Sequence, residues 1–202
     1  MAVPFTNLNR LRTRLYHETK NKGYELVSYI SSKAFVWRNA TVGENCFIFE
    51  NNVIQHHVNN GNNVILWSGN HVGHRSVIKD NCFISSHVVI AGNCEIGENC
   101  FIGVNSTFND ELKVGKDCFI SSGTLVIKNA LEGKIYKGSP AKASSVDVYR
   151  YFNIERESLF CNLISIIQLV LVQKVIFCSL KSEVLPFSMG ILGFKREHLQ
   201  IV

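Results

Sequence analysis

The most regular feature of the sequence is an apolar residue at every sixth position from Ile30 to Val126, a series that only Asn60 breaks. A period of six matches neither the 3.6-residue repeat of a helix nor the two-residue alternation of a strand, which argues against a helical bundle and a β-sandwich. It is typical of an all-β solenoid, in which each six-residue unit supplies one short strand and one turn. The series consists of Ile30, Val36, Val42, Ile48, Ile54, Asn60, Leu66, Val72, Ile78, Ile84, Ile90, Ile96, Ile102, Phe108, Val114, Ile120 and Val126.

Three such units close a triangular coil of eighteen residues, so the series predicts a parallel β-helix of about five to six coils. The predicted organisation is a helical lead-in at residues 1–29, the β-helix with a capping exit at 30–145, and a C-terminal extension at 146–202. Leucines at helical spacing in the lead-in predict a short helix that stops near Gly23. The turn-rich stretch 136–142 is expected to cap the last coil.

Two classes of small residue share the six-residue phase. Glycine recurs one place after the apolar position, where we expect a tight turn with positive φ to select it. Cysteine recurs four places after the apolar position, where the side chain is expected to point into a narrow corner of the coil. The glycines are Gly43, Gly61, Gly73, Gly97, Gly103 and Gly115. The cysteines are Cys46, Cys82, Cys94, Cys100 and Cys118, and they share their slot with Ala34, Ala40, Ser76, Ser106 and Thr124.

Composition narrows the possible functions. The phase assigns five of the seven cysteines to packing, and no CxxC pair occurs, which argues against a zinc site. The net charge is +5, but the basic residues are dispersed without an interleaved aromatic platform, which argues against nucleic-acid binding. Residues 1–14 lack the apolar core of a secretory signal, and with free thiols this indicates a cytoplasmic protein.

The C-terminal extension contains an apolar stretch at residues 159–177. Its length would span a bilayer, yet polar residues such as Asn162 and Gln168 dilute the signal. The favoured interpretation is a helix or strand that packs on the solenoid or on a neighbouring subunit. Membrane association and a poorly ordered tail are the alternatives.

Histidines supply the polar groups that the repeat does not require. Residues eighteen apart stack in adjacent coils, so His56, His74 and Gly92 form one column with neighbours about 4.8 Å apart. A neutral imidazole can take a proton from an attacking amine or hydroxyl, and a glycine N–H can stabilise the oxyanion of a thioester. His74 is therefore the first candidate for a catalytic base and His71 the second, against the alternative that each is a solvated surface residue.

Three parts of the sequence carry a resemblance to a known family. They are the repeats with Trp67-Ser-Gly-Asn-His-Val-Gly-His74, the segment Ile90–Val104, and the exit Gly138-Ser-Pro-Ala-Lys142. Together they resemble the left-handed β-helix hexapeptide-repeat acyltransferases. Within that family the likeness is to bacterial acetyltransferases that act on nucleotide-linked amino sugars or on sialic acid, and it covers about residues 5–145.

The resemblance implies a homotrimer, with acetyl-CoA in the groove between adjacent β-helices. It implies His74 as the general base and Gly92 as the glycine whose backbone N–H faces the thioester carbonyl. Gly103 and Gly123 match backbone positions along the pantetheine path, and Lys142 is placed near the phosphates of the cofactor. The implied activity is transfer of an acetyl group to an amine or hydroxyl of a sugar, in surface-polysaccharide biosynthesis.

The sequence departs from the family in two places. In many relatives an acidic residue follows the base, whereas Arg75 follows His74 here, so another group such as His56 or Asn70 is expected to orient the imidazole. Relatives also have an N-terminal domain for the nucleotide sugar, and residues 1–29 resemble only its last helix. Two rival interpretations remain open. One is a non-catalytic scaffold, and the other is a zinc enzyme similar to carbonic anhydrase, which would need a histidine two coils beyond His56.

Overall fold

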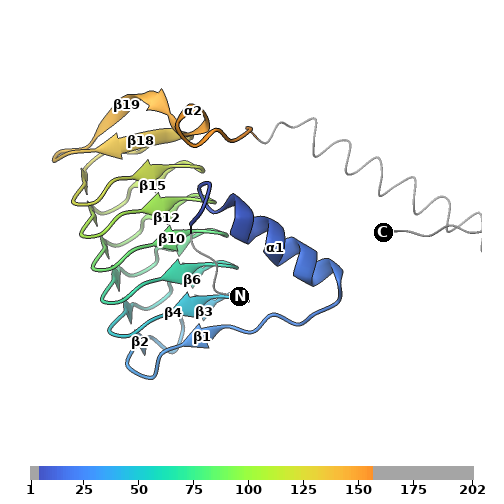
Figure 1. The fold of residues 1–202 in the computed structure, drawn as a ribbon. Coiled ribbons are helices and arrows are strands. Elements are labelled where there is room, and N and C mark those ends of the chain that lie inside the picture. Colours follow the sequence, from blue (N-terminus) through green and yellow to red (C-terminus); the bar gives the residue numbers. More distant parts are fainter. Residues whose placement is uncertain (1–4, 157–202) are drawn as a thin grey trace, which may run out of the picture. The chain divides into compact units, whose positions relative to one another are not determined.

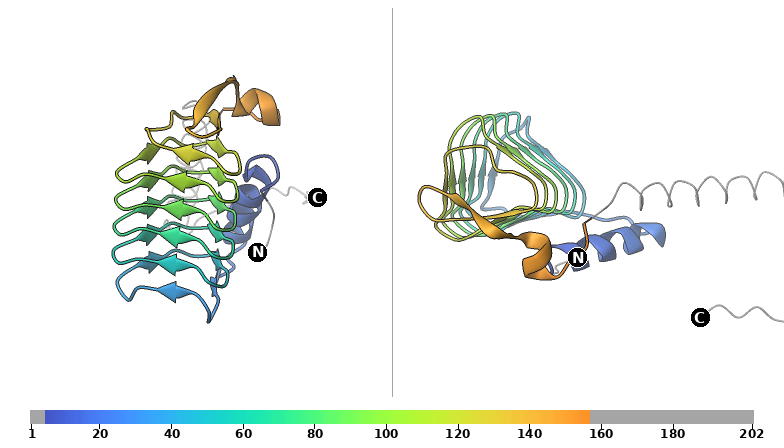
Figure 2. Two further views of the ribbon diagram at one scale, coloured as in Figure 1. Left: turned by 90° about the vertical axis from the view of Figure 1, so that its left-hand side faces the viewer. Right: turned by 90° about the horizontal axis from the view of Figure 1, so that it is seen from above.

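The computed structural model describes residues 5–156, and residues 1–4 and 157–202 lie outside this description. Two-residue strands follow one another every six residues from β1 (Tyr29–Ile30) to β17 (Leu125–Val126). They form three parallel sheets along the faces of a triangular prism, which Figure 2 shows end-on. The chain thus folds as the left-handed parallel β-helix that the period of six and the resemblance predict.

Each sheet consists of strands from successive coils, so neighbours in a sheet are eighteen residues apart, as His71 and Val89 are. Sheet A contains β1, β4 (Phe47–Ile48), β7 (Ile65–Leu66), β10 (Phe83–Ile84), β13 (Phe101–Ile102), β16 (Phe119–Ile120), β18 (Lys134–Lys137) and β19 (Lys142–Asp147). Sheet B contains β2 (Phe35–Val36), β5 (Val53–Ile54), β8 (His71–Val72), β11 (Val89–Ile90), β14 (Thr107–Phe108) and β17. Sheet C contains β3 (Thr41–Val42), β6 (Asn59–Asn60), β9 (Val77–Ile78), β12 (Glu95–Ile96) and β15 (Lys113–Val114).

Four-residue turns join the sheets at the three edges of the prism, which we call corners AB, BC and CA (Figure 1). Corner AB comprises residues 31–34, 49–52, 67–70, 85–88, 103–106 and 121–124. Corner BC comprises residues 37–40, 55–58, 73–76, 91–94 and 109–112. Corner CA comprises residues 43–46, 61–64, 79–82, 97–100 and 115–118.

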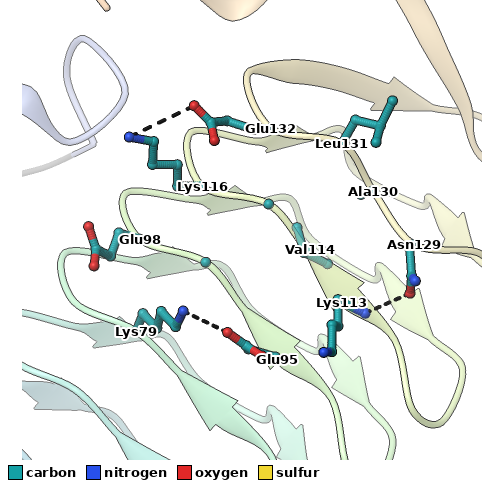
Figure 3. Close-up of a pocket in the computed structure, with 12 residues that line it drawn as sticks. Lys79, Glu95, Glu98, Lys113, Val114, Lys116, Asn129, Ala130, Leu131 and Glu132 are labelled. Atoms are coloured by element: carbon teal, nitrogen blue, oxygen red, sulfur yellow. Dashed lines mark hydrogen bonds and ion pairs between the residues drawn. The ribbon is translucent and has the colours of Figure 1, made fainter. Parts of the chain in front are cut away.

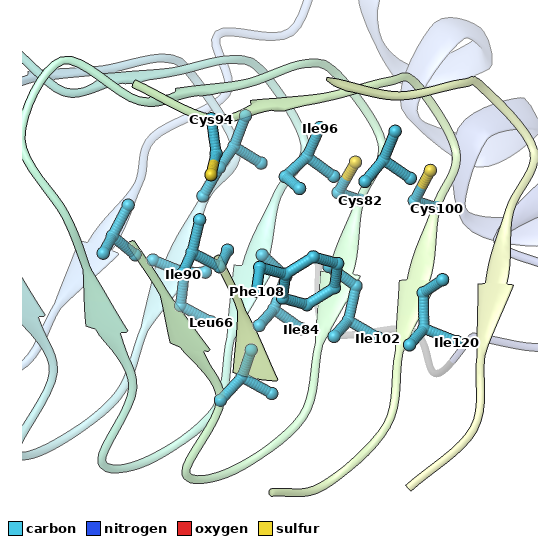
Figure 4. Packing of buried hydrophobic residues seen from close by; sticks show 14 of the residues in the cluster. Leu66, Cys82, Ile84, Ile90, Cys94, Ile96, Cys100, Ile102, Phe108 and Ile120 are labelled. Carbon is cyan, nitrogen blue, oxygen red and sulfur yellow. The ribbon is translucent and has the colours of Figure 1, made fainter. Parts of the chain in front are cut away.

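The core is formed by the second residue of each strand, whose side chain points into the prism. Ile84, Ile102 and Ile120, labelled in Figure 4, are examples and are completely buried. Each such side chain contributes about 1.5–3 kcal/mol through burial, so the six-residue period is the signature of the core itself. Asn60, the one exception, is also buried, and its Nδ2 donates to the carbonyl of Gly61 at 3.2 Å.

The predicted slot for small side chains is confirmed. The five cysteines at that slot are free thiols with exposed fractions of 0–1%. In corner CA, Cys82 Sγ donates to the carbonyl of Gly97 at 3.0 Å and Cys100 Sγ to that of Gly115 at 3.2 Å. These cysteines act as small buried side chains between coils.

The predicted reason for the recurring glycines is wrong. None of the six has positive φ. A Cβ added at Gly73 would lie 2.5 Å from the carbonyl carbon of Ala91, and one at Gly103 would lie 2.4 Å from the backbone N of Ser122. Glycine is selected there because the backbone of the next coil approaches too closely for any side chain.

Positive φ occurs instead at the third residue of the turns, and asparagine dominates that slot. Asparagine tolerates the left-handed conformation better than other non-glycine residues because its short side chain bonds locally. The non-glycine residues in this slot are Asn45, Asn51, His57, Asn63, Arg75, Asn81, His87, Asn93, Asn99, Asn105, Glu111 and Asp117.

The predicted lead-in helix is α1 (Arg10–Asn21), which lies along corner CA. Arg12 is 1% exposed and donates to the carbonyls of Asn63 and Asn81, while Asn9 Nδ2 donates to the carbonyl of Asn99 at 3.2 Å. A helix rises about 1.5 Å per residue and coils are about 4.8 Å apart, so one turn of α1 spans roughly one coil. This match lets α1 contact successive coils.

The exit forms the predicted cap. Strand β18 pairs parallel with β16 and antiparallel with β19, and α2 (Val148–Phe152) follows. Tyr136 is buried against the core, and Ala141 N donates to the carbonyl of Leu125 at 2.7 Å. The described residues up to Glu155 form one compact unit.

The apolar stretch 159–177 lies outside the described residues, so its predicted packing stays a prediction. Within residues 5–156, no helix has the length and apolar character needed to cross a membrane.

Candidate active site

The imidazole of His74 is held between two neighbours in corner BC. Below it, the ring of His56 is stacked at a centroid distance of 5.5 Å and an interplanar angle of 20°. Above it lies the Cα of Gly92, where a Cβ would stand 2.4 Å from His74 Cε1 and 2.6 Å from Nε2. The predicted column of His56, His74 and Gly92 is therefore present, and the absence of a side chain at residue 92 makes room for the ring.

A hydrogen-bonded chain determines the tautomer of His56. Asn39 Oδ1 accepts from the backbone N–H of His57 at 3.1 Å, so its Nδ2 is the atom that donates to His57 Nε2 at 3.3 Å. His57 Nδ1 must then carry the proton that it shares with His56 Nδ1 at 3.1 Å. His56 is left with its proton on Nε2. Partial burial, and then the charges of His57, His74 and Arg75, lower the pKa of His56, which favours this neutral form.

Neither group expected to orient His74 does so by a hydrogen bond. Asn70 is buried in corner AB, where its Nδ2 donates to the carbonyl of Trp67 at 2.5 Å and its Oδ1 accepts from Val88 N at 2.7 Å. His56 packs on the face of the His74 ring rather than on its edge. Gln55 Oε1 accepts from the backbone N–H of His74 at 2.8 Å and so fixes the turn that carries the ring.

The backbone N–H of Gly92 is already engaged. It donates to Asp110 Oδ1 at 2.7 Å, from one coil further on. Asp110 is exposed, so its carboxylate can rotate into solvent. A thioester oxygen could bind this N–H only after Asp110 had turned away from it.

The other predicted site residues lie on different parts of the prism. His71 is half-buried on the outer face of β8, and within the described residues no ring contact or hydrogen bond joins it to His74. Gly103 and Gly123 both lie in corner AB, across sheet B from His74. Lys142 begins β19 and, with Lys128, lines a cavity of about 270 Å³.

Another hollow lies elsewhere, on sheet C (Figure 3). Its volume is about 600 Å³, and ion pairs of alternating charge line it, including Lys79–Glu95 at 2.6 Å and Lys116–Glu132 at 3.8 Å. None of the predicted site residues lines it. Residues 5–156 also contain no group of three or more His, Cys, Asp or Glu side chains that could hold a metal ion.

Sequence reasoning missed Gln55, Asn39 and Asp110. The signal was available for Asp110 because it lies two coils beyond His74 in the same column. For Gln55 and Asn39 it was not, since the repeat assigns a position to a column but does not say which side chains turn toward a neighbour.

Comparison with known proteins places this geometry in context. Residues 93–128 match the family model described as bacterial transferase hexapeptide, six repeats. No curated protein matches the chain in sequence.

Among solved structures, perosamine N-acetyltransferase from Caulobacter crescentus, a mutant in complex with CoA and GDP-perosamine, has 24% identity and a TM-score of 0.68 over 69% of this chain and 67% of that one. The acetyltransferase domain of PglB from Neisseria gonorrhoeae, in complex with acetyl coenzyme A, has 24% identity and a TM-score of 0.67 over 69% and 68%. AntD, an N-acyltransferase from Bacillus cereus, has 14% identity and a TM-score of 0.57 over 78% and 96%. The chain thus shares its hexapeptide-repeat β-helix fold with these acyltransferases.

Proposed function

We propose that this protein transfers the acetyl group of acetyl-CoA to an amine or hydroxyl of a sugar, with a nucleotide-linked sugar as the acceptor. The observation that carries the proposal is the position of the His74 imidazole directly beneath the Cα of Gly92. A base and a backbone N–H in adjacent coils are the two groups that direct acyl transfer from a thioester needs.

In the proposed reaction the acceptor nitrogen or oxygen attacks the thioester carbonyl carbon while His74 takes its proton. The N–H of Gly92 stabilises the developing oxyanion after Asp110 has left it. The carbon–sulfur bond then breaks, and the proton held by His74 neutralises the departing CoA thiolate. Atoms and charge balance without a metal ion or a covalent enzyme intermediate.

The donor is proposed to lie along the half of the column beyond Gly92. Lys128 stands two coils above Gly92 in that column, and Lys142 lines the same 270 Å³ cavity, so two ammonium groups are available for the phosphates of CoA. Gly103 and Gly123 lie across sheet B, and their use in the same site requires corner AB of a second copy. We therefore propose a homotrimer with a site at each interface.

Light scattering tests the assembly, which should have three times the mass of the chain. A mixture of a His74→Ala variant with a Gly123→Trp variant should also regain activity, because mixed assemblies contain interfaces at which both corners are intact. A mixture as inactive as its parts would show that His74 and residue 123 do not meet at one interface.

Steady-state acetyl transfer to a panel of nucleotide amino sugars tests the catalytic role. His74→Ala should lower kcat by at least about 10²-fold, the usual contribution of a general base. His17→Ala, on the exposed face of α1, is the matched control and should leave the rate unchanged. An unchanged rate in the His74 variant would overturn the proposed mechanism.

The main alternative is a non-catalytic scaffold. Calorimetric titration with CoA separates the two, because a scaffold has no reason to bind it. Absence of CoA binding in the intact protein would favour the scaffold.

A further inference from the structure

The catalytic column continues in the opposite direction, toward the first coil. Arg38 lies in the same turn position as His56 and His74, one and two coils earlier. With coils about 4.8 Å apart, Arg38 stands roughly 10 Å from His74 along the axis. It is exposed and makes no hydrogen bond or ion pair with any other residue of the described chain.

Two exposed aromatic residues precede Arg38 in the chain. Phe35 is 53% exposed and Trp37 is 42% exposed, and their rings meet edge-to-face at 5.7 Å and 73°. The indole of Trp37 also meets the ring of His56 at 6.0 Å and 68°. Trp37 therefore connects an exposed aromatic surface to the histidine stack that ends at His74.

The polar groups beside these rings are fixed donors. The chain from Asn39 through His57 leaves His56 with an N–H at Nε2. A neutral donor next to an aromatic ring suits the hydroxyls of a sugar, and a guanidinium suits the paired oxygens of a diphosphate. Aromatic rings stack with nucleobases in a manner that tolerates any base.

Charge distinguishes the two halves of the column. Beyond His74 the first ionised side chain of the column is Asp110, which repels phosphate, whereas before it the first permanently charged side chain is Arg38. An acceptor whose phosphates lie within two coils of the reacting group therefore gains by approaching from the side of the first coil, whereas the pantetheine arm carries the phosphates of CoA past Asp110 to Lys128. The acetyl donor is left with the other half, which ends at Lys128 and Lys142.

We propose that Arg38, Trp37 and Phe35 form the subsite for the nucleoside diphosphate of the acceptor. Arg38 binds the diphosphate, the aromatic rings stack on the base, and His56 Nε2 donates to the sugar. The reactive amine or hydroxyl then reaches His74. This inference rests on the proposed function and extends it by assigning the acceptor to residues of the β-helix itself.

The chain contains only two tryptophans, Trp37 and Trp67, which gives a direct test by fluorescence. Trp67→Phe keeps only Trp37 as an emitter. Titration with UDP, GDP or dTDP should quench the emission of this variant in a saturable way. The matched control is Arg38→Gln in the same Trp67→Phe background, which should need about tenfold more nucleotide for the same quench. Equal responses of the two proteins would overturn the proposal.

Calorimetry with the same nucleoside diphosphates, without acetyl-CoA, tests Arg38. Arg38→Gln should weaken binding about tenfold or more, as loss of a charged bidentate contact does. Arg14→Gln, at an exposed arginine of α1, is the control and should bind as the wild type does. Absence of binding to the wild-type protein would also overturn the subsite.

Kinetics separates this inference from the proposed function. Arg38→Gln should raise KM for a nucleotide amino sugar far more than KM for free glucosamine, which carries no diphosphate, and the affinity for acetyl-CoA should stay the same. If the His74→Ala variant loses activity but Arg38→Gln does not change KM, the proposed transferase function is supported and the proposed subsite is wrong. If Trp37→Ala dissociates the assembly while nucleotide binding by Arg38→Gln stays normal, this surface is an interface between copies, and the subsite falls as well.

Discussion

Corners CA and BC are built from the same backbone repeat but use it differently. In corner CA the left-handed slot contains Asn45, Asn63, Asn81, Asn99 and Asp117. Their side chains form a ladder, in which Asn45 Nδ2 donates to Asn63 Oδ1 at 2.9 Å and Asn63 Nδ2 to Asn81 Oδ1 at 2.7 Å. In corner BC the same slot contains His57, Arg75, Asn93 and Glu111. One corner is uniform and covered by α1, and the other is varied and exposed.

The difference shows how a solenoid separates stability from chemistry. Asparagine suits the left-handed slot, whereas histidine and arginine there lose about 1–2 kcal/mol per residue to the same geometry. In corner BC this cost falls on His57 and Arg75, in the two coils around His74. Other residues than asparagine also occupy this slot at His87 in corner AB and at Glu111 in corner BC, so the strain is not confined to these two coils, but two of its positions adjoin the candidate base.

The largest expected effect belongs to corner CA. Arg12→Met removes the donors that satisfy the carbonyls of Asn63 and Asn81, and each unsatisfied buried group costs about 1–3 kcal/mol, so the free energy of unfolding should fall by about 2–5 kcal/mol. Urea unfolding measures this. Arg14→Met, with a side chain that is 66% exposed, should change it by less than about 0.5 kcal/mol. Equal effects would mean that α1 does not anchor this corner.

A pair of glycine substitutions sharpens the comparison. The Cβ of Gly92→Ala meets the movable ring of His74, so acetyl transfer should fall by about 10²-fold with little change in stability. The Cβ of Gly97→Ala meets the backbone N of Lys116 at 2.5 Å, so overpacking should cost about 1–3 kcal/mol of stability. Thermal melts measure the stability of each variant, and steady-state assays measure its rate of acetyl transfer. The difference between the two glycines would be contradicted if both variants lost mainly stability or both lost mainly activity.

Asp110 gives a smaller effect. Asp110→Ala frees the Gly92 N–H and removes a carboxylate that competes with the thioester oxygen, so acetyl-CoA should bind about 3–10-fold more tightly, or about 0.7–1.4 kcal/mol. Calorimetry measures the affinity, and Glu111→Ala removes a neighbouring exposed carboxylate as the control. Weaker binding in the Asp110 variant would show that this carboxylate does not mask the N–H.

The smallest expected effect is a loss of folding stability at alkaline pH, which depends on Tyr16 beside corner CA. Burial, and then the hydrogen bond that Tyr16 donates to Glu44, raise the pKa of Tyr16 well above its usual range. A group whose pKa is raised in the folded state stabilises it fully below the unfolded pKa of about 10, and this stability is lost as pH rises above that value. Wild-type protein should therefore lose about 1 kcal/mol more between pH 9 and 11 than Tyr16→Phe does. Urea unfolding gives the free energy of unfolding at each pH. An equal decrease of this free energy in the two proteins between pH 9 and 11 would refute the assignment.

Much of the fold could be predicted because the period of six is the core itself. The slot for Cys82 and Cys100 follows from counting in sixes, and the column through His74 follows from counting in eighteens. The role of the recurring glycines could not be predicted, since a tight turn and a close approach of the next coil select the same residue. Asn70 was expected to orient His74, but its side chain turns into corner AB instead.

The sequence by itself determined the β-helix and the column that brings His56, His74 and Gly92 into register, because a repeat of fixed rise converts position in the chain into position in space. Tertiary structure decided what those residues can do. It placed Asp110 on the Gly92 N–H, determined the tautomer of His56 through Asn39, and left Trp37 and Arg38 exposed at the end of the column. These features depend on side-chain rotation at the corners, where neighbouring coils and not the repeat select the conformation.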